Sequence, residues 1–141
     1  MTTSITGGCA CGVIRYECTA EPIVCAHCQC LDCQRFSGAG HFSTMFVPLD
    51  AVTLTGTPKF YETIADNGKA VRRGFCPECG SPVFGQHTQR PQFGVLPAGS
   101  LDDPGRFDPA FVVFSGRGHV WDVMDPALPT FPGMPPRRDR P

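Results

Sequence analysis

Nine cysteines, most of them in three short clusters, are the feature that most limits how this chain can fold. One pair, Cys9 and Cys11, lies in a glycine-rich stretch, and a second pair, Cys76 and Cys79, frames a C-P-E-C turn. Between these pairs, residues 28–33 have the sequence CQCLDC. Thiols this close in sequence can converge on one ion with little loop-closure cost. They are poorly placed to form disulfides with each other, so metal ligation is the favoured role.

The two outer pairs together offer four thiolates, the number of ligands that tetrahedral zinc takes. A site built from both pairs would tie the N-terminal strand to a hairpin in the middle of the chain. Gly80 follows the second pair directly and allows backbone amides to face the thiolates. Because closed four-cysteine sites are usually structural, we expect Cys9, Cys11, Cys76 and Cys79 to hold a structural zinc.

The middle cluster, which consists of Cys28, Cys30 and Cys33, leaves two possibilities open. Cys25 could complete a closed structural site, or the fourth position could stay free for water or a substrate, as in catalytic zinc sites. The apolar, strand-like context of Cys25 mildly favours its burial as a small hydrophobic residue. Cys18 ends an expected strand and has no nearby cysteine partner, so we predict that it lies in the core.

The four histidines are weaker indicators of a metal site. His27 adjoins the middle cluster, but neighbouring residues on extended backbone point apart, so we expect it beside the site or at the surface. His41 could line the site or replace a ligand. His87 and His119 are expected to be structural.

The chain's length suggests one domain. Its 16 glycines and 15 prolines favour many turns and short strands over long helices. Residues 6–11 are predicted as a turn, and residues 31–36 as one helical turn ended by Gly38. Asp66, Asn67 and Gly68 are predicted to connect a hairpin. Alternation and turn residues predict strands at 13–18, 23–25, 42–47, 52–55, 59–64, 69–75, 93–96, 110–114 and 119–123.

Prolines recur from Asp125 onward too often for regular structure. We therefore predict a zinc-binding β domain over residues 1–124 and an extended or disordered tail over residues 125–141. The net charge of -1 disfavours a nucleic-acid partner. No apolar run is long enough for a membrane span, and no secretory leader is recognisable at the start. Clustered cysteines without such a leader predict a reducing compartment, the cytoplasm.

Four stretches of the chain resemble the glutathione-dependent formaldehyde-activating enzyme family, which also includes centromere protein V. In chain order they are GGCACGVIRYE, CQCLDCQRFSGAG, RRGFCPECGSPVF and GSLDDP, and the match extends from Gly7 to Trp121. The resemblance implies a mainly β, zinc-stabilised β-tent fold of stacked small antiparallel sheets with short helical turns. Many relatives have histidine between the first two cysteines of the middle cluster, where this chain has Gln29; the histidine of this chain lies instead at His27.

The resemblance also implies two zinc ions per chain. It assigns Cys9, Cys11, Cys76 and Cys79 to a structural zinc. It assigns Cys28, Cys30 and Cys33 to a catalytic-type zinc with an exchangeable fourth position, which leaves Cys25 out.

The resemblance, together with the three-cysteine cluster, implies a carbon–sulfur lyase of the S-(hydroxymethyl)glutathione synthase type. It would handle an adduct of a small-molecule thiol such as glutathione with formaldehyde or a similar small carbonyl. Arg35, Arg72 and Arg73 are candidates to hold the carboxylates of glutathione. One alternative is a non-catalytic, zinc-stabilised interaction module. Another is a sensor of zinc or redox state that acts through labile thiols.

Overall fold

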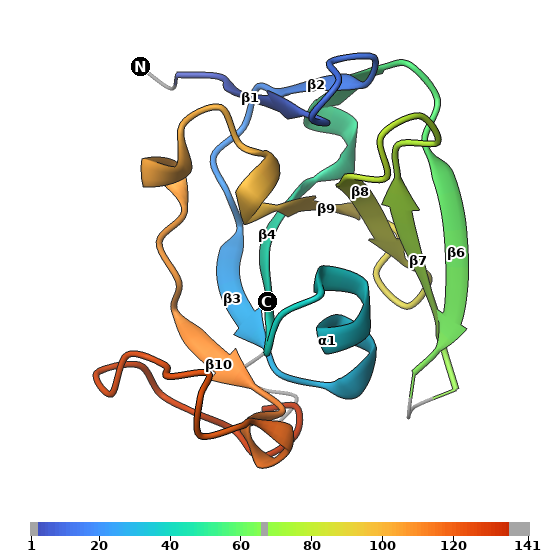
Figure 1. Cartoon of the computed structure of the whole chain (residues 1–141). Helices are drawn as coiled ribbons and strands as arrows, with labels where there is room; N and C mark the ends of the chain where they lie inside the picture. Colours follow the sequence, from blue (N-terminus) through green and yellow to red (C-terminus); the bar gives the residue numbers. More distant parts are fainter. Residues whose placement is uncertain (1–2, 66–67, 136–141) are drawn as a thin grey trace.

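The computed structural model describes residues 3–65 and 68–135, which form two β-sheets and a single α-helix (Figure 1). The expectation of a mainly β fold is therefore confirmed. The helix is α1 (Leu31–Ser37). The strands are β1 (Ile5–Gly8), β2 (Arg15–Cys18), β3 (Val24–Cys28), β4 (Phe42–Pro48), β5 (Val52–Thr55), β6 (Lys59–Ile64), β7 (Ala70–Phe75), β8 (Pro82–His87), β9 (Phe93–Pro97) and β10 (Phe111–Val113).

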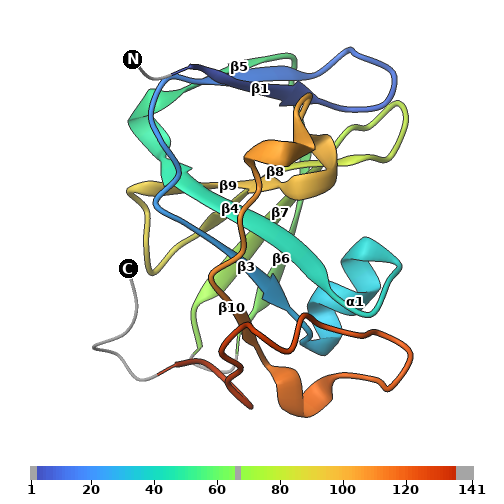
Figure 2. The same cartoon turned by 90° about the vertical axis from the view of Figure 1, so that its left-hand side faces the viewer.

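The two sheets differ in size. The smaller one has the antiparallel order β1-β2-β5 and lies across one end of the molecule, at the top of Figure 1. The larger sheet has the order β10-β3-β4-β9-β8-β7-β6. Its neighbours are antiparallel, except that β10 joins the edge of β3 in parallel. Figure 2 shows the smaller sheet above the strands of the larger one.

One apolar face of the larger sheet packs in the core, and the other lines a cavity. Successive side chains on a strand point to opposite faces, and β4 shows the consequence. Met45 and Val47 are fully buried in a core shared with the smaller sheet. Phe42, Thr44 and Phe46 alternate with them and line a cavity on the other face.

Helix α1 lies beside this second face, between β4 and the β6–β7 hairpin (Figure 1). It begins at the N-cap Cys30, whose thiol accepts a hydrogen bond from the Cys33 amide, and ends at Gly38. Gly38 has a φ of 71°, a left-handed conformation that suits glycine at the end of a helix. The predicted helical turn and its end are confirmed.

Two predictions of local structure were wrong, and one strand was missed. Residues 5–8 form β1 rather than the start of a turn, because they pair in register with β2. Strand β8 was not predicted at all. Residues 119–123 form no strand and lie in a loop. Residues 66 and 67 of the predicted hairpin connection lie outside the described part of the chain.

The proline-rich segment after residue 124 contains no helix or strand over residues 125–135. It nevertheless returns alongside β10, where the Val112 amide donates to the Pro129 carbonyl and the Phe131 amide donates to the Val112 carbonyl. Residues 136–141 of the predicted tail lie outside the described residues, and the division at residue 124 stays a prediction. Among the residues described, no helix is long and apolar enough to cross a membrane.

Candidate metal centres and the adjoining cavity

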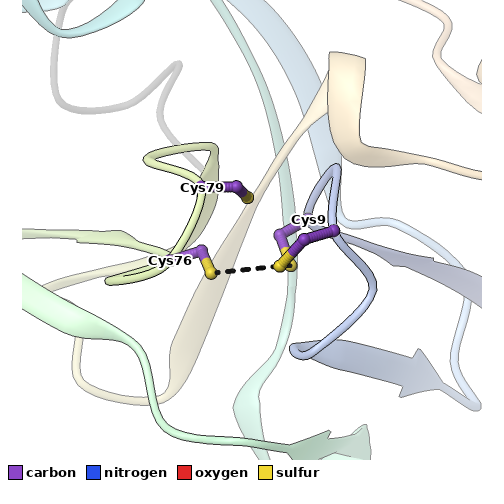
Figure 3. Close-up of side chains that lie close together, drawn as sticks. Cys9, Cys76 and Cys79 are labelled. Carbon is purple, nitrogen blue, oxygen red and sulfur yellow. Dashed lines mark hydrogen bonds between the residues drawn. The ribbon is translucent and has the colours of Figure 1, made fainter.

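The structure brings the two outer cysteine pairs together. The sulfur atoms of Cys9, Cys11, Cys76 and Cys79 all lie within 4.8 Å of one another. Cys9 and Cys11 come from the β1–β2 turn, and Cys76 and Cys79 face them from the β7–β8 turn (Figure 3). The Sγ atoms of Cys11 and Cys76 are 3.8 Å apart across this gap. The cluster therefore joins the smaller sheet to the larger one.

Backbone amides face these thiols, as expected for metal-binding turns. The Ile14 amide donates to Cys9 Sγ at 3.3 Å, and the Glu78 amide donates to Cys76 Sγ at 3.4 Å. Hydrogen bonds from Ser81 lower the pKa of the Cys79 thiol to about 5. Four convergent sulfurs, held by amides that favour thiolates, form a donor set that fits zinc.

The middle cluster also converges. The sulfurs of Cys28, Cys30 and Cys33 lie within 4.8 Å of one another. Cys28 ends β3, Cys30 caps α1, and Cys33 lies in the first turn of that helix. Neither Cys25 nor His41 belongs to a metal-ligating group in the described residues. Cys25 instead lies in the core, because its position on β3 places it on the opposite face from Cys28.

The three thiols have unequal proton affinities. Hydrogen bonding from Cys28 and Cys33, together with the charge of Arg73, lowers the pKa of the Cys30 thiol. Hydrogen bonding to Cys30 and Cys33, together with burial, raises the pKa of the Cys28 thiol. The Arg73 Nη1 atom lies 3.7 Å from Cys33 Sγ. The local field thus favours negative charge on a sulfur of the cluster.

A cavity of about 770 Å³ opens beside the middle cluster, and all three of its cysteines line it. None of the four outer cysteines is among the lining residues. Basic side chains contribute to the wall, while Asp32 is the one acidic side chain among the described lining residues. These basic residues are Arg72, Arg73, Arg90 and Arg117. The cavity therefore combines three thiols with charged lining residues that are mostly cationic.

The three arginines predicted to bind carboxylates differ in position. Arg73 lines the cavity; its Nε atom is buried and has no hydrogen-bond partner among the described residues. Arg72 also lines the cavity, but it donates to Gln86, pairs with Glu62 and lies over the Phe60 ring. Arg35 is exposed on α1 and is not a lining residue.

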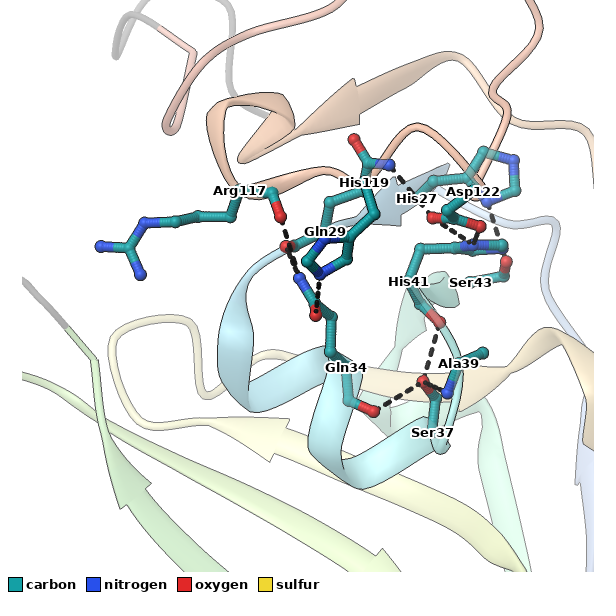
Figure 4. Close-up of polar contacts among 10 residues, drawn as sticks. All are labelled: His27, Gln29, Gln34, Ser37, Ala39, His41, Ser43, Arg117, His119 and Asp122. Carbon is teal, nitrogen blue, oxygen red and sulfur yellow. Dashed lines mark hydrogen bonds and ion pairs between the residues drawn. The ribbon is translucent and has the colours of Figure 1, made fainter.

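Gln29 lies between the first two cysteines of the middle cluster but joins a different network (Figure 4). It is 4% exposed, and its Nε2 atom donates to Asp122 at 3.1 Å. The Asp122 carboxylate also pairs with His41 Nδ1 at 2.8 Å. His27 is bonded to Ser43 through Nδ1, and burial lowers its pKa. This histidine-containing network therefore supports the loop around the thiols without supplying a ligand.

Hydrogen bonds from the Gln34 side chain connect the loop after β10 to helix α1. Its Nε2 atom donates to the carbonyls of Gln29 and Arg117, and its Oε1 atom contacts His119 Nε2 at 2.9 Å (Figure 4). The sequence contains no local signal for Asp122 or Gln34, because their partners are far away in the chain. His119 has the structural role expected of it, whereas His87 lines the cavity.

Comparison with known proteins places these features in a family. The family model described as glutathione-dependent formaldehyde-activating enzyme matches residues 4–117. No curated protein matches the chain. A crystal structure of a Rhodobacter sphaeroides protein is similar in fold, with a TM-score of 0.57 and 15% sequence identity. The alignment covers 89% of this chain and 98% of that one.

Proposed function

The chain belongs to the glutathione-dependent formaldehyde-activating enzyme family, and we propose that it is a carbon–sulfur lyase acting on a thiol adduct. The thiol would be glutathione or a similar small molecule, and the carbonyl would be formaldehyde or a similar small compound. The reaction joins the thiol sulfur to the carbonyl carbon and moves the thiol proton to the carbonyl oxygen. The reverse reaction releases both compounds, so no oxidant or reductant is needed.

One observation carries this proposal: the two cysteine clusters differ in ligand number and in surroundings. Four sulfurs converge at the junction of the sheets, whereas three converge in the wall of the 770 Å³ cavity. A four-thiolate set fills a tetrahedral ion, while a three-thiolate set leaves one position open. We therefore assign a structural zinc to Cys9, Cys11, Cys76 and Cys79, and a catalytic-type zinc to Cys28, Cys30 and Cys33.

When bound to the three cysteines, zinc would supply Lewis acidity that favours the thiolate form of a thiol at neutral pH. The side chains of this protein would bind and orient the reactants. Arg73 lies next to Cys33 and has an unsatisfied Nε atom, so it is the best-placed group to pair with a glutathione carboxylate. The loop held by Gln34 brings Arg117 to the same cavity.

Titration of glutathione into the zinc-loaded protein by calorimetry tests this function. We expect saturable binding to the wild type, no binding to Cys30→Ser, and loss of about one zinc ion per chain from that variant. Cys25→Ala is the matched control, since Cys25 lies in the core outside both clusters. It should keep its zinc content and its glutathione binding. Unchanged zinc content and turnover in Cys30→Ser would refute the proposal.

A non-catalytic interaction module is the second candidate, and one feature favours it. The loop after β10 exposes three apolar side chains, with Val120 97%, Trp121 67% and Val123 82% exposed. Exposed apolar groups this close together are typical of contact surfaces. The same titration separates the two candidates, because an interaction module would keep two zinc ions per chain and bind no glutathione.

A further inference from the structure

We propose that the carbonyl partner carries an aromatic or similarly bulky apolar group, which binds against the phenylalanine-lined part of the cavity. This inference rests on the proposed function and names the substrate class for the same site. It departs from formaldehyde, whose carbonyl carbon bears only hydrogen atoms. The features that carry it are the floor of the cavity, its aromatic walls and the backbone conformation of one wall residue.

The floor of the cavity is a set of aligned positions on the larger sheet. Cys28 pairs with Phe42 in the register of β3 and β4, so the apolar surface begins directly beside the thiol cluster. Two residues before Cys28 on β3, the paired positions carry smaller side chains. Ala26 there pairs with Thr44 of β4 on one side and with Phe111 of β10 on the other. These small side chains lie in the floor of the cavity beside Phe111 in the same row of paired positions and between Phe42 and Phe46 along β4.

The walls are aromatic on several elements. The Phe36 ring of α1 meets the Phe42 ring edge-on, with centroids 5.4 Å apart. Phe46 faces the cavity from β4, and its ring contacts that of His87. Burial, with the charges of Arg73 and Arg90, lowers the pKa of His87 to about 4, so this ring is neutral at physiological pH. The complete set of lining phenylalanines is Phe36, Phe42, Phe46, Phe84, Phe111 and Phe114.

Phe114 contributes to this wall from a strained backbone. Its φ of 55° makes it the single described non-glycine residue with positive φ, and a bulky side chain rarely adopts this conformation. Hydrogen bonds hold it there: its amide donates to the Gly133 carbonyl, and its carbonyl accepts from the Arg117 amide. Glycine would relieve the strain, so a phenylalanine held here is consistent with a task for its side chain in the cavity.

The cavity is large and apolar beyond what a one-carbon carbonyl requires. A volume of about 770 Å³ lies within the roughly 300–1,000 Å³ of sites that enclose drug-sized ligands. Arg73 and Arg117 suit the carboxylates of the thiol, but a formaldehyde adduct presents no apolar group to the phenylalanines. An aldehyde with a ring-sized substituent would bury that ring in the part of the cavity lined by Phe46 and Phe114, while its thiol partner reaches the cluster.

A comparison of three ligands by calorimetry on the zinc-loaded protein tests the inference. Glutathione tests the proposed function. S-methylglutathione and S-benzylglutathione are stable thioethers that mimic the adducts of a small and an aromatic carbonyl. They share the same peptide and differ only in the apolar group. We expect S-benzylglutathione to bind about 10–100-fold more tightly than S-methylglutathione, because a buried ring contributes about that much.

Two substitutions test where the benzyl ring of S-benzylglutathione binds. Phe46→Ala and Phe114→Gly should each reduce the preference for S-benzylglutathione by about tenfold. Both should leave S-methylglutathione binding unchanged, which also shows that the variant is folded. Phe93→Ala is the matched control, since Phe93 is a half-buried phenylalanine on β9 outside the cavity lining. It should keep the full preference.

The outcomes distinguish the two proposals. If glutathione does not bind, the proposed function with glutathione as the thiol fails, and the inference fails with it. If glutathione binds but the two thioethers bind equally, or the methyl compound binds more tightly, only the inference is overturned. A benzyl preference that survives both cavity substitutions would also overturn it, because the ring would then lie elsewhere.

Discussion

At the scale of single residues, the position of a cysteine on its strand or helix determines whether it lies in the core or in a thiol cluster. Cys25 and Cys28 lie on the same strand, yet one belongs to the core and the other to the thiol cluster, because an odd separation places them on opposite faces. Arg72 and Arg73 are neighbours on β7 and both line the cavity, but their contacts differ. Arg72 is engaged by Glu62 and Gln86, whereas Arg73 reaches Cys33.

This difference predicts that Arg73 dominates the binding of an anionic thiol. Arg73→Gln should weaken glutathione binding by about 10–100-fold, because a charge-assisted hydrogen bond in a partly buried site is lost. Isothermal calorimetry at constant ionic strength measures the effect. Arg35→Gln is the control and should bind like the wild type, since Arg35 is exposed outside the cavity. Equal losses in both variants would mean that general surface charge attracts the ligand.

At the scale of elements, the β7–β8 pair connects the two candidate sites. Its turn carries Cys76 and Cys79, while β7 carries Arg73 in the wall of the cavity. The register shifts between Gly74 and Phe75, immediately before the first cysteine of the turn. This irregularity allows the turn to project its thiols toward the smaller sheet while the rest of β7 stays paired.

Gly74 is the glycine of this pair at which an added side chain would come closest to the neighbouring strand. A Cβ atom added at Gly74 would lie 2.1 Å from the Phe84 carbonyl oxygen, so the backbones of β7 and β8 would have to separate. We expect Gly74→Ala to lower the free energy of unfolding by about 2 kcal/mol or more. Denaturant unfolding measures this change.

Gly99→Ala provides the matched comparison for Gly74→Ala. No atom lies within 4 Å of a Cβ added at Gly99, so this variant should be nearly as stable as the wild type. Equal stability of the two variants would show that the β7–β8 pair can relax around the added methyl group.

At the scale of the whole molecule, the four-cysteine cluster links parts that are distant in sequence. It joins the β1–β2 turn to the β7–β8 turn, and so one sheet to the other, beside a core that includes buried Cys9 and Cys76. The three-cysteine cluster is local, because β3 and α1 supply all of its members. Metal at the first cluster should therefore stabilise the fold, and metal at the second should matter mainly for binding.

This contrast predicts different consequences of losing each metal. Cys76→Ser should lower the free energy of unfolding by about 3 kcal/mol or more, because the binding energy of a structural metal contributes directly to folding. Cys30→Ser should lower it by much less. Thermal unfolding with parallel measurement of zinc content tests this pair, and chelator added to the wild type should release one zinc ion before the protein unfolds. Equal destabilisation by the two substitutions would contradict the division into a structural and a catalytic-type site.

The sequence by itself determined the features that depend on short stretches of chain. The three-cysteine cluster and the helical turn ending at Gly38 follow from local spacing and backbone preference, and the burial of Cys18 follows from its place on a strand. Only the tertiary structure decided which distant groups meet. Strand register places Phe42 beside Cys28 and directs Arg73 into the cavity. Residues 119–123 form a loop rather than the predicted strand, and in this loop the Asp122 carboxylate accepts a long-range hydrogen bond from Gln29. Local preferences act within a few residues, whereas these contacts depend on how the strands pair across the whole chain.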